Sequence, residues 1–410
     1  AAAPEPAQDE PLSSEPRPAE PREAEPLARD GYLRIGVLLP MAEPIAKDLR
    51  NAAELALFNM KSDRVALQFY DSKGTFEGGR EAARRAGADD ADIIVGPLFK
   101  DEVDGARREA SVPILSFTTD PSVLGPGVFS LGFSPAEQTA EIARYAASRG
   151  LARHALITPD SPSGQMVRRA FKSAAKGSIE KDESYSRDTI ASVLRSAANW
   201  DEREKEHKDA AESADARFAL LQARMESADY DGSDDAEMAE LETLRAELKK
   251  KRTLSPPPFD SVFVFGDDMS DVVMLASTLL YYDVRPDQVK FLGTSQLDNE
   301  KAFAERALKG AWFPTAGADY GEKFAAAFEK YFGRRPAKMA SLAYDAVALA
   351  ANLPSPSSRD IENPNGFMGV GGVFRFRRDG TAEHSMRIME ISGGRQGARV
   401  ASPAAQRFED

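Results

Sequence analysis

Short apolar runs that end at a turn or breaker residue recur along this chain, and a segment with helical spacing follows each of them. The first run, Leu33–Leu39, is stopped by Pro40. A run this short between breakers is typical of a buried parallel strand. The pattern returns at 65–70, 93–95 and 114–116. This β-α rhythm with short connections predicts a doubly wound parallel sheet.

The rhythm is interrupted by the segment 127–133 and then restarts with new apolar runs at 155–158, 262–265 and 289–293. A chain of 410 residues is too long for one ordinary domain. We therefore predict an α/β fold with two Rossmann-like doubly wound lobes.

The interruptions of the rhythm predict three crossings between the lobes, near residues 130, 314 and 365. Residues 372–377 and 386–391 are expected to pair as a hairpin, because the Asp-Gly pair at 379–380 is a strong turn signal. The predicted boundaries are 32–131 and 316–362 for lobe 1, and 132–315 and 363–410 for lobe 2.

Two segments do not share the rhythm. Residues 1–31 are rich in Pro, Glu and Ala and have almost no large apolar residue, which predicts a disordered tether. Residues 197–252 are highly charged, yet Phe218, Leu221 and Met225 repeat at spacings of three and four, as do Met238, Leu241, Leu244 and Leu248. We interpret this block as an antiparallel helical hairpin inserted in lobe 2. It either packs on its own lobe or docks another protein.

Composition excludes several kinds of function. The net charge of −13 argues against a general nucleic-acid binder, which needs a positive surface. The absence of cysteine excludes disulfides and thiolate chemistry, and the three scattered histidines make a histidine metal site or a Ser-His-Asp triad implausible. No phosphate-binding glycine loop is present. We therefore expect no enzyme activity, no catalytic residue, no metal and no cofactor.

Loops at the strand ends are the candidate binding site, because ligands of open parallel sheets lie beyond the carboxyl ends of the strands. The hydroxyl, amide and acidic groups there suit a small polar ligand, although the same residues are ordinary helix N-caps. The lobe 1 candidates are Leu98, Phe99, Ser116, Thr118, Thr119 and Asp120. The lobe 2 candidates are Asp160, Ser161, Ser163, Asp267, Asp268, Met269, Ser295 and Gln296.

Several stretches resemble the type I, or leucine/isoleucine/valine-type, periplasmic binding protein superfamily. They are IGVLLPMAEPIAKDLRNAAELAL, DIIVGPLFKDEV and VPILSFTTDPSVLGPGVFSLGFSPAEQ. Four others, LGTSQLDN, GAWF, RPAKMASLAYDAVALAA and GFMGVGGVFRFRRDGTAE, are similar to its penicillin-binding protein activator branch. That resemblance implies a lipoprotein of the periplasm or cell envelope of a Gram-negative bacterium, attached through an N-terminal lipid anchor.

The chain departs from the amino-acid receptors of this superfamily. The resemblance implies an aromatic residue in the loop 43–48, a tyrosine where Ser163 stands, and a carboxylate within 294–296 to hold the ligand's ammonium; none of these is present. Ser116 and Thr119 remain where a ligand carboxylate is expected. A buried ammonium without a carboxylate is costly, so the fold carries over better than the amino-acid specificity.

Two functions follow as hypotheses. The first is an activator-like regulator of peptidoglycan synthesis that contacts a peptidoglycan synthase. The second is the substrate-binding protein of an ABC transporter, which captures a small polar or amino-acid-like ligand between the lobes and delivers it to a permease. The lobe architecture alone does not choose between them.

Overall fold

The structure is a computed structural model that describes residues 31–227, 231–250, 254–316, 320–394 and 397–408. The predicted tether, residues 1–31, therefore lies outside the described residues except for its last position. Within them, the chain forms two compact units. Unit 1 comprises residues 31–137, 315–388 and 402–408, and unit 2 comprises 138–314 and 389–401.

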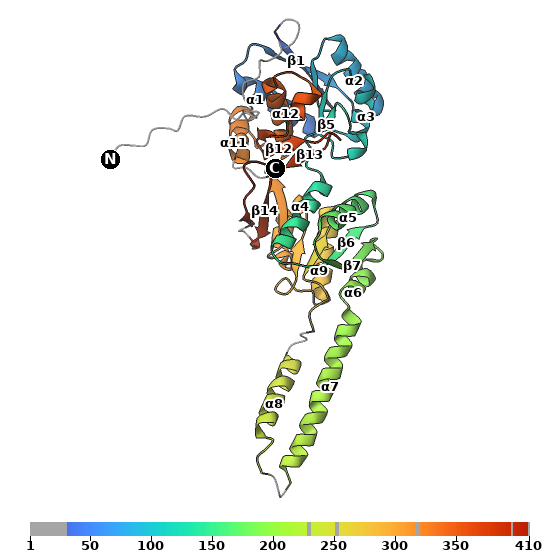
Figure 1. The fold of residues 1–410 in the computed structure, drawn as a ribbon, viewed down its shortest axis with the longest axis vertical. Coiled ribbons are helices and arrows are strands. Elements are labelled where there is room, and N and C mark those ends of the chain that lie inside the picture. Colours follow the sequence, from blue (N-terminus) through green and yellow to red (C-terminus); the bar gives the residue numbers. More distant parts are fainter. Residues whose placement is uncertain (1–30, 228–230, 251–253, 317–319, 395–396, 409–410) are drawn as a thin grey trace, which may run out of the picture. The chain divides into compact units, whose positions relative to one another are not determined.

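Unit 1 contains a five-stranded sheet with the order β2-β1-β3-β4-β5, in which each neighbouring pair is parallel. Its strands are β1 (Leu33–Leu39), β2 (Val65–Asp71), β3 (Ile93–Val95), β4 (Ile114–Ser116) and β5 (Val128–Ser130). Its helices are α1 (Pro44–Met60), α2 (Phe76–Ala88), α3 (Lys100–Glu109), α11 (Tyr320–Phe332), α12 (Ala340–Asn352) and α13 (Ser358–Ile361), with the 3-10 turn η1 (Pro121–Val123) (Figure 1).

Each face of this sheet has its own core, because successive residues of a strand point to opposite sides. Val37 and Val95 belong to the core that includes residues of α1 and α12, whereas Leu38 and Ile94 belong to the core that includes residues of α2 and α3. The uninterrupted apolar runs of the sequence are therefore explained by a sheet that is covered on both faces.

Unit 2 is built on a seven-stranded sheet with the order β15-β14-β10-β9-β8-β6-β7. Its strands are β6 (Arg153–Pro159), β7 (Ser178–Tyr185), β8 (Ser261–Val264), β9 (Lys290–Leu292), β10 (Trp312–Ala316), β14 (Met386–Ile391) and β15 (Ala398–Ser402). The helices are α4 (Pro135–Ser148), α5 (Pro162–Ala174), α6 (Ile190–Ala197), α7 (Trp200–Met225), α8 (Asp235–Lys250), α9 (Met269–Tyr281) and α10 (Glu300–Ala304), with the 3-10 turns η2 (Ser295–Leu297) and η3 (Arg306–Leu308).

The predicted third crossing near residue 365 is corrected. Residues 363–388 belong to unit 1, and the chain passes to unit 2 after Ile388 and returns after Ala401. The reason is that Phe367, Phe374 and Phe376 are buried in the unit 1 core.

The predicted hairpin between 372–377 and 386–391 is also wrong. A separate antiparallel sheet has the order β11-β12-β13, formed by β11 (Phe367–Gly369), β12 (Gly372–Phe376) and β13 (Ala382–His384). The hairpin partner of β12 is thus β13, and β14 joins the unit 2 sheet instead. The first two crossings fall after Glu137 and Pro314, where the rhythm of the sequence predicted them near 130 and 314.

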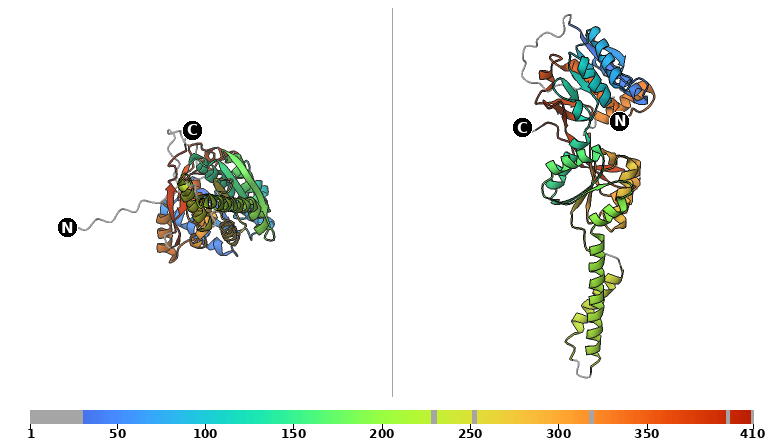
Figure 2. Two further views of the ribbon diagram at one scale, coloured as in Figure 1. Left: turned by 90° about the horizontal axis from the view of Figure 1, so that it is seen from below. Right: turned by 90° about the vertical axis from the view of Figure 1, so that its right-hand side faces the viewer.

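The inserted block forms two helices that lie side by side, α7 and α8 (Figure 2). Leu221 and Met238 are buried in a small core between the helices, as the spacing predicts. Salt bridges flank this core, including Arg245–Asp215 at 2.5 Å and Arg224–Asp234 at 3.1 Å. Leu244 was predicted to belong to the apolar repeat that packs between the two helices, but it is 45% exposed.

The base of the hairpin is fixed by Arg203, a buried residue of α7 that sequence reasoning missed. Its guanidinium donates to the carbonyl oxygens of Ser255 at 2.5 Å and of Tyr282 at 3.2 Å, and it contacts the Asp283 carboxylate at 3.3 Å. Burial lowers the pKa of Arg203. Ala197 and Ala198 lie in the unit 2 core, so the insertion begins at Trp200 rather than at residue 197.

Replacing residues 207–252 by a short Gly/Ser bridge should leave unit 2 folded, because the removed core is internal to the hairpin and Arg203 is retained. We expect a midpoint change in thermal unfolding of at most about 3 °C, which corresponds to about 1 kcal/mol for a unit of this size. Circular dichroism with tryptophan fluorescence measures it. Aggregation, or a much larger decrease in the unfolding midpoint, would contradict the prediction that unit 2 folds without the hairpin.

Candidate functional site

Three loops of unit 2 meet at the carboxyl ends of its parallel strands. Ser161 ends the β6 loop and caps α5, accepting a hydrogen bond from the Gly164 N–H at 3.2 Å. Asp267 follows β8, and its Oδ1 accepts the Ser161 hydroxyl at 2.8 Å and the Ser163 hydroxyl at 2.6 Å. These hydroxyls and the carboxylate, predicted separately, therefore form one cluster.

Gln296 extends this cluster from the β9 loop. Its side-chain nitrogen donates to the Gly266 carbonyl at 2.7 Å, whereas its buried Oε1 has no hydrogen-bond partner in the described structure. The neighbouring Ser295 presents its N–H to the Gln138 side chain at 2.7 Å, and its own side chain is exposed. The edge thus offers a carboxylate and an amide carbonyl, both hydrogen-bond acceptors.

The other unit 2 candidates have local structural roles. Asp268 is the N-cap of α9, and it accepts hydrogen bonds from Ser270 and from the Asp271 N–H and pairs with Arg187 at 2.9 Å. The pKa of Asp268 is lowered, chiefly by the hydrogen bond from the Ser270 side chain, and further by the Asp271 N–H and the nearby Arg187 guanidinium. Met269 packs partly against the unit 2 core, and Asp160 is exposed.

In unit 1, the hydroxyls expected to hold a ligand carboxylate are mostly engaged. Ser116 is fully buried, and its hydroxyl donates to the Phe129 carbonyl at 2.9 Å. Thr118 is also buried, and its hydroxyl oxygen accepts from the Asp120 N–H at 3.2 Å. Thr119 is the exposed member of this set.

Asp120 caps η1 and pairs with Lys100 at 3.1 Å, so the loops after β3 and β4 are joined by an ion pair. Burial acts to raise the pKa of Asp120, but hydrogen bonds from Ser122 and the charge of Lys100 outweigh it and lower the pKa. Asp120 is therefore a tethered carboxylate, already neutralised by a neighbour.

Leu98 is buried, while Phe99 is 41% exposed at the start of α3. Their loop is fixed by Glu102, which the sequence analysis did not single out. Its buried carboxylate accepts from the N–H groups of Phe99 and Gly74, both at 2.8 Å. A Glu three residues after the N-cap is a capping-box signal that could have identified this residue.

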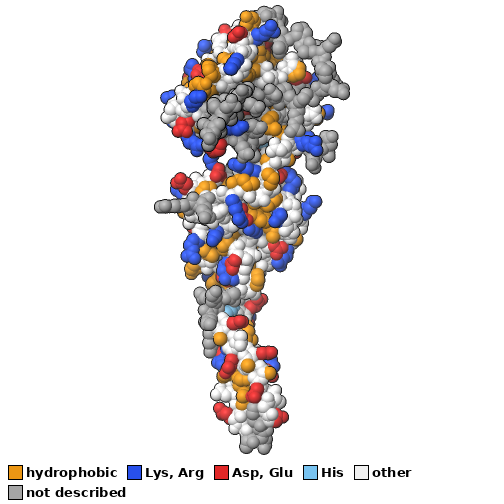
Figure 3. Space-filling view, turned by 90° about the vertical axis from the view of Figure 1, so that its left-hand side faces the viewer, with side chains coloured by type: hydrophobic (Ala, Val, Ile, Leu, Met, Phe, Trp, Pro, Cys, Tyr) orange, Lys and Arg blue, Asp and Glu red, His pale blue; other side chains and the backbone are white. Residues whose placement is uncertain are grey.

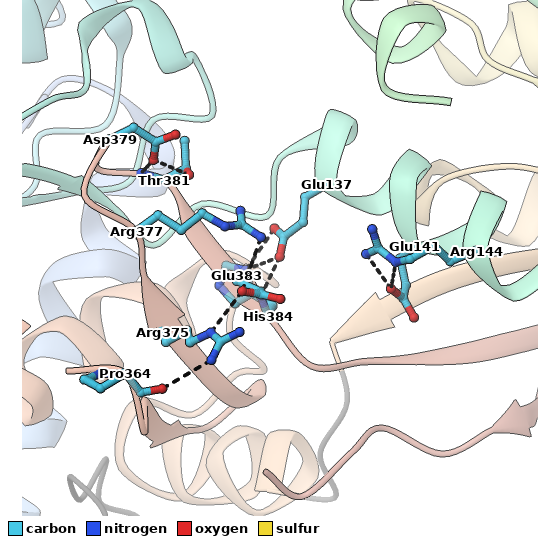
Figure 4. A network of polar contacts seen from close by, with 10 residues as sticks. All are labelled: Glu137, Glu141, Arg144, Pro364, Arg375, Arg377, Asp379, Thr381, Glu383 and His384. Carbon is cyan, nitrogen blue, oxygen red and sulfur yellow. Dashed lines mark hydrogen bonds and ion pairs between the residues drawn. The ribbon is translucent and has the colours of Figure 1, made fainter. Parts of the chain in front are cut away.

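Two of the three histidines make polar side-chain contacts in the described structure. His154 lies near the start of β6 and is buried in unit 2, with its Nδ1 2.7 Å from the Ser261 hydroxyl. His384 contacts the Glu137 carboxylate at 3.0 Å (Figure 4). Its ring also stacks on Phe133. No cluster of metal-ligating side chains occurs among the described residues.

The chain belongs to the periplasmic binding protein family, whose model matches residues 33–396. This is a family of binding proteins, and membership implies a periplasmic or other extracytoplasmic location. No helix within the described ranges is both long and apolar enough to cross a membrane. None of the curated proteins matches the chain.

Solved structures of two kinds share the fold. A putative branched-chain amino acid ABC transporter protein from Rhodospirillum rubrum is 18% identical, with a TM-score of 0.62 over 90% of this chain and 99% of that one. The substrate-binding protein LivJ from Streptococcus pneumoniae, in complex with isoleucine, is 15% identical, with a TM-score of 0.53 over 91% and 100%. The C-domain of LpoA from Haemophilus influenzae, a regulator of PBP1A, is 13% identical, with a TM-score of 0.57 over 90% and 99%. The predicted two-lobed α/β fold is thereby confirmed.

Proposed function

We propose that this chain is a non-enzymatic envelope protein that acts through protein–protein contact, as a penicillin-binding protein activator-like regulator of peptidoglycan synthesis. The observation that carries the proposal is that the strand-end hydroxyls are already used. Ser116, Ser161 and Ser163 all donate to acceptors of the protein itself. The resemblance of the sequence to the activator branch supports the same function and an N-terminal lipid anchor.

An enclosed amino acid needs hydrogen-bond donors for its carboxylate. A receptor that offered Ser116 would have to break its buried bond to the Phe129 carbonyl, which would leave that acceptor unsatisfied at a cost of about 1–3 kcal/mol. Thr119 alone among the candidate hydroxyls of unit 1 is exposed. This depleted donor set favours a role that does not depend on capturing an amino acid.

The helical hairpin supports a role in protein contact, because it enlarges the surface of unit 2. Its exposed side chains include Leu220, at 64%, and Leu244, at 45%. Figure 3 shows acidic, basic and hydrophobic side chains interspersed on the face of the helical hairpin that is in view. The rim of a protein interface is likewise polar and solvent-accessible.

The test is direct binding and activation. The purified chain is added to a detergent-solubilised bifunctional peptidoglycan synthase from the same organism, and glycan polymerisation is followed from its lipid-linked precursor. We expect binding and faster polymerisation, both weakened when residues 207–252 are replaced by the Gly/Ser bridge. A synthase that neither binds the full chain nor changes its rate would overturn the proposal.

A second candidate, the substrate-binding protein of an ABC transporter, is favoured by the acceptors of unit 2. The Asp267 carboxylate and the unpartnered Gln296 Oε1 would suit the ammonium or hydroxyl donors of a small polar or amino-acid-like ligand. A thermal-shift screen of amines and amino acids tests it. This candidate predicts a stabilising ligand whose effect Asp267→Asn abolishes; a screen without any stabilising ligand would reject it.

A further inference from the structure

An open hollow of about 860 Å³ lies in unit 2 at the edge where β9 and β10 begin. It is lined by η3, by the end of β14 and by the start of β15. The candidate loops described above follow the opposite, carboxyl ends of β6, β8 and β9. The hollow is therefore a separate feature of the unit, and it plays no part in the proposed function.

Glu390, the less exposed of the two acids that line the hollow, is already neutralised. Glu390 accepts from the Arg399 guanidinium at 2.6 Å and from the Trp312 indole N–H at 2.8 Å, and its carboxylate is 3.8 Å from the Lys290 ammonium. Two cations thus share one carboxylate. The Lys290 ammonium also donates to the Gly310 carbonyl at 2.9 Å, which fixes it beneath the floor of the hollow.

Two further cations, Arg306 and Lys309, line the hollow with exposed side chains and have no acidic partner within the described residues. They stand three positions apart at the two ends of η3, and side chains at this spacing lie on the same side of a 3-10 turn. The remaining acid, Asp287, is 70% exposed and lies 3.8 Å from Arg285. Three cationic side chains and two carboxylates therefore line the hollow, and the Lys290 ammonium lies 3.8 Å from one of those carboxylates, in a chain whose net charge is −13.

We propose that this hollow binds the phosphoryl group of a phosphate or diphosphate ligand. A guanidinium fork and a neighbouring ammonium match the several oxygens of such a group. Arg306 and Lys309 have no acidic partner in the described part of the chain, and Arg399 and Lys290 share the single carboxylate of Glu390. This excess of positive charge favours an oxyanion with two or more negative charges over a single carboxylate. The hollow is open, so the group can belong to a soluble compound or to a lipid headgroup.

The experiment uses inorganic pyrophosphate as a soluble probe and phosphatidic acid vesicles, whose headgroup is a phosphomonoester, as a headgroup probe, both at low ionic strength. Calorimetry measures the first and co-sedimentation the second. Arg306→Glu with Lys309→Glu should weaken binding about tenfold or more, because both unpaired cations are reversed. The matched control, Arg169→Glu with Lys176→Glu, changes the net charge equally at exposed positions outside the hollow and should retain binding.

If the unaltered chain binds pyrophosphate and only the Arg306→Glu, Lys309→Glu variant loses that binding, the result supports a site for soluble phosphates. Binding of vesicles alone, with the same selectivity, supports the lipid headgroup as the source. Failure of the unaltered chain to bind either probe would overturn the proposal, and so would an equal loss in the two double variants, since that reports overall charge. Unchanged melting curves check that both variants are folded.

Discussion

Gly105→Ala should strongly destabilise unit 1. Helices α2 and α3 pack so closely that a Cβ at Gly105 would stand 2.0 Å from the Phe76 carbonyl oxygen, a main-chain atom that cannot rotate away. The helices would have to separate, and we expect a loss of about 3 kcal/mol, at the upper end for overpacking. Urea unfolding followed by far-ultraviolet circular dichroism measures the loss.

The matched control is Gly87→Ala in the neighbouring helix α2, where an added Cβ meets no atom within 4 Å. Here the reduced flexibility of the unfolded chain should leave stability unchanged or raise it by about 0.5–1 kcal/mol. Similar effects of the two substitutions would show that helix propensity, and not the close approach of the helices, sets the outcome.

Arg203→Met should have a comparable effect on unit 2. The substitution removes a buried guanidinium, leaves the Ser255 and Tyr282 carbonyls without this donor, and takes away one of the two cations beside the Asp283 carboxylate, which keeps Arg285 at 3.4 Å. Removing one partner of a buried charged contact typically costs about 3–5 kcal/mol. The fluorescence of Trp200, which packs edge-on against Tyr282, reports the unfolding of this region.

Arg217→Met on the same helix is the control for Arg203→Met. Arg217 pairs with Glu237 across the hairpin, and its side chain is 63% exposed. Exposed ion pairs contribute about 0–1 kcal/mol, so the fluorescence transition should barely move. An equal loss in the two variants would mean that Arg203 acts through helix α7 generally and not through its buried contacts.

The sequence predicted the strands that are buried on both faces, because a sheet covered on both sides requires continuous apolar runs such as Leu33–Leu39, but it did not predict β7, β11, β13 or β15. The sequence also predicted the helical hairpin, in which the apolar residues of α7 pack against those of α8. The partner of Met386–Ile391 could not be predicted in the same way. Its apolar character fits either sheet, and the turn at 378–381 is equally compatible with the short strand Ala382–His384.

The sequence placed the candidate residues at strand ends, but it did not predict their contacts. Residue type and position placed Ser161, Ser163 and Asp267 at strand ends, but only geometry shows that they bind one another. Ser116 was expected to face a ligand, yet its hydroxyl points to the Phe129 carbonyl. The direction of a short hydroxyl depends on the nearest acceptor in the folded chain, and sequence spacing does not contain that information. Arg203 was missed for the same reason, since a highly charged helix gives no sign of which cation is buried.

Calorimetric titration of the purified chain with leucine, isoleucine and valine tests most directly whether the protein works without capturing an amino acid. Three losses act together: the engaged Ser116 hydroxyl, the segment 294–296 without a carboxylate, and the loop 43–48 without an aromatic residue. They should weaken binding by about two to four decades in affinity relative to a receptor that has these groups. We expect no dissociation constant tighter than about 100 μM for any of the three ligands. A dissociation constant at or below about 1 μM would contradict the account and make amino-acid capture the primary function.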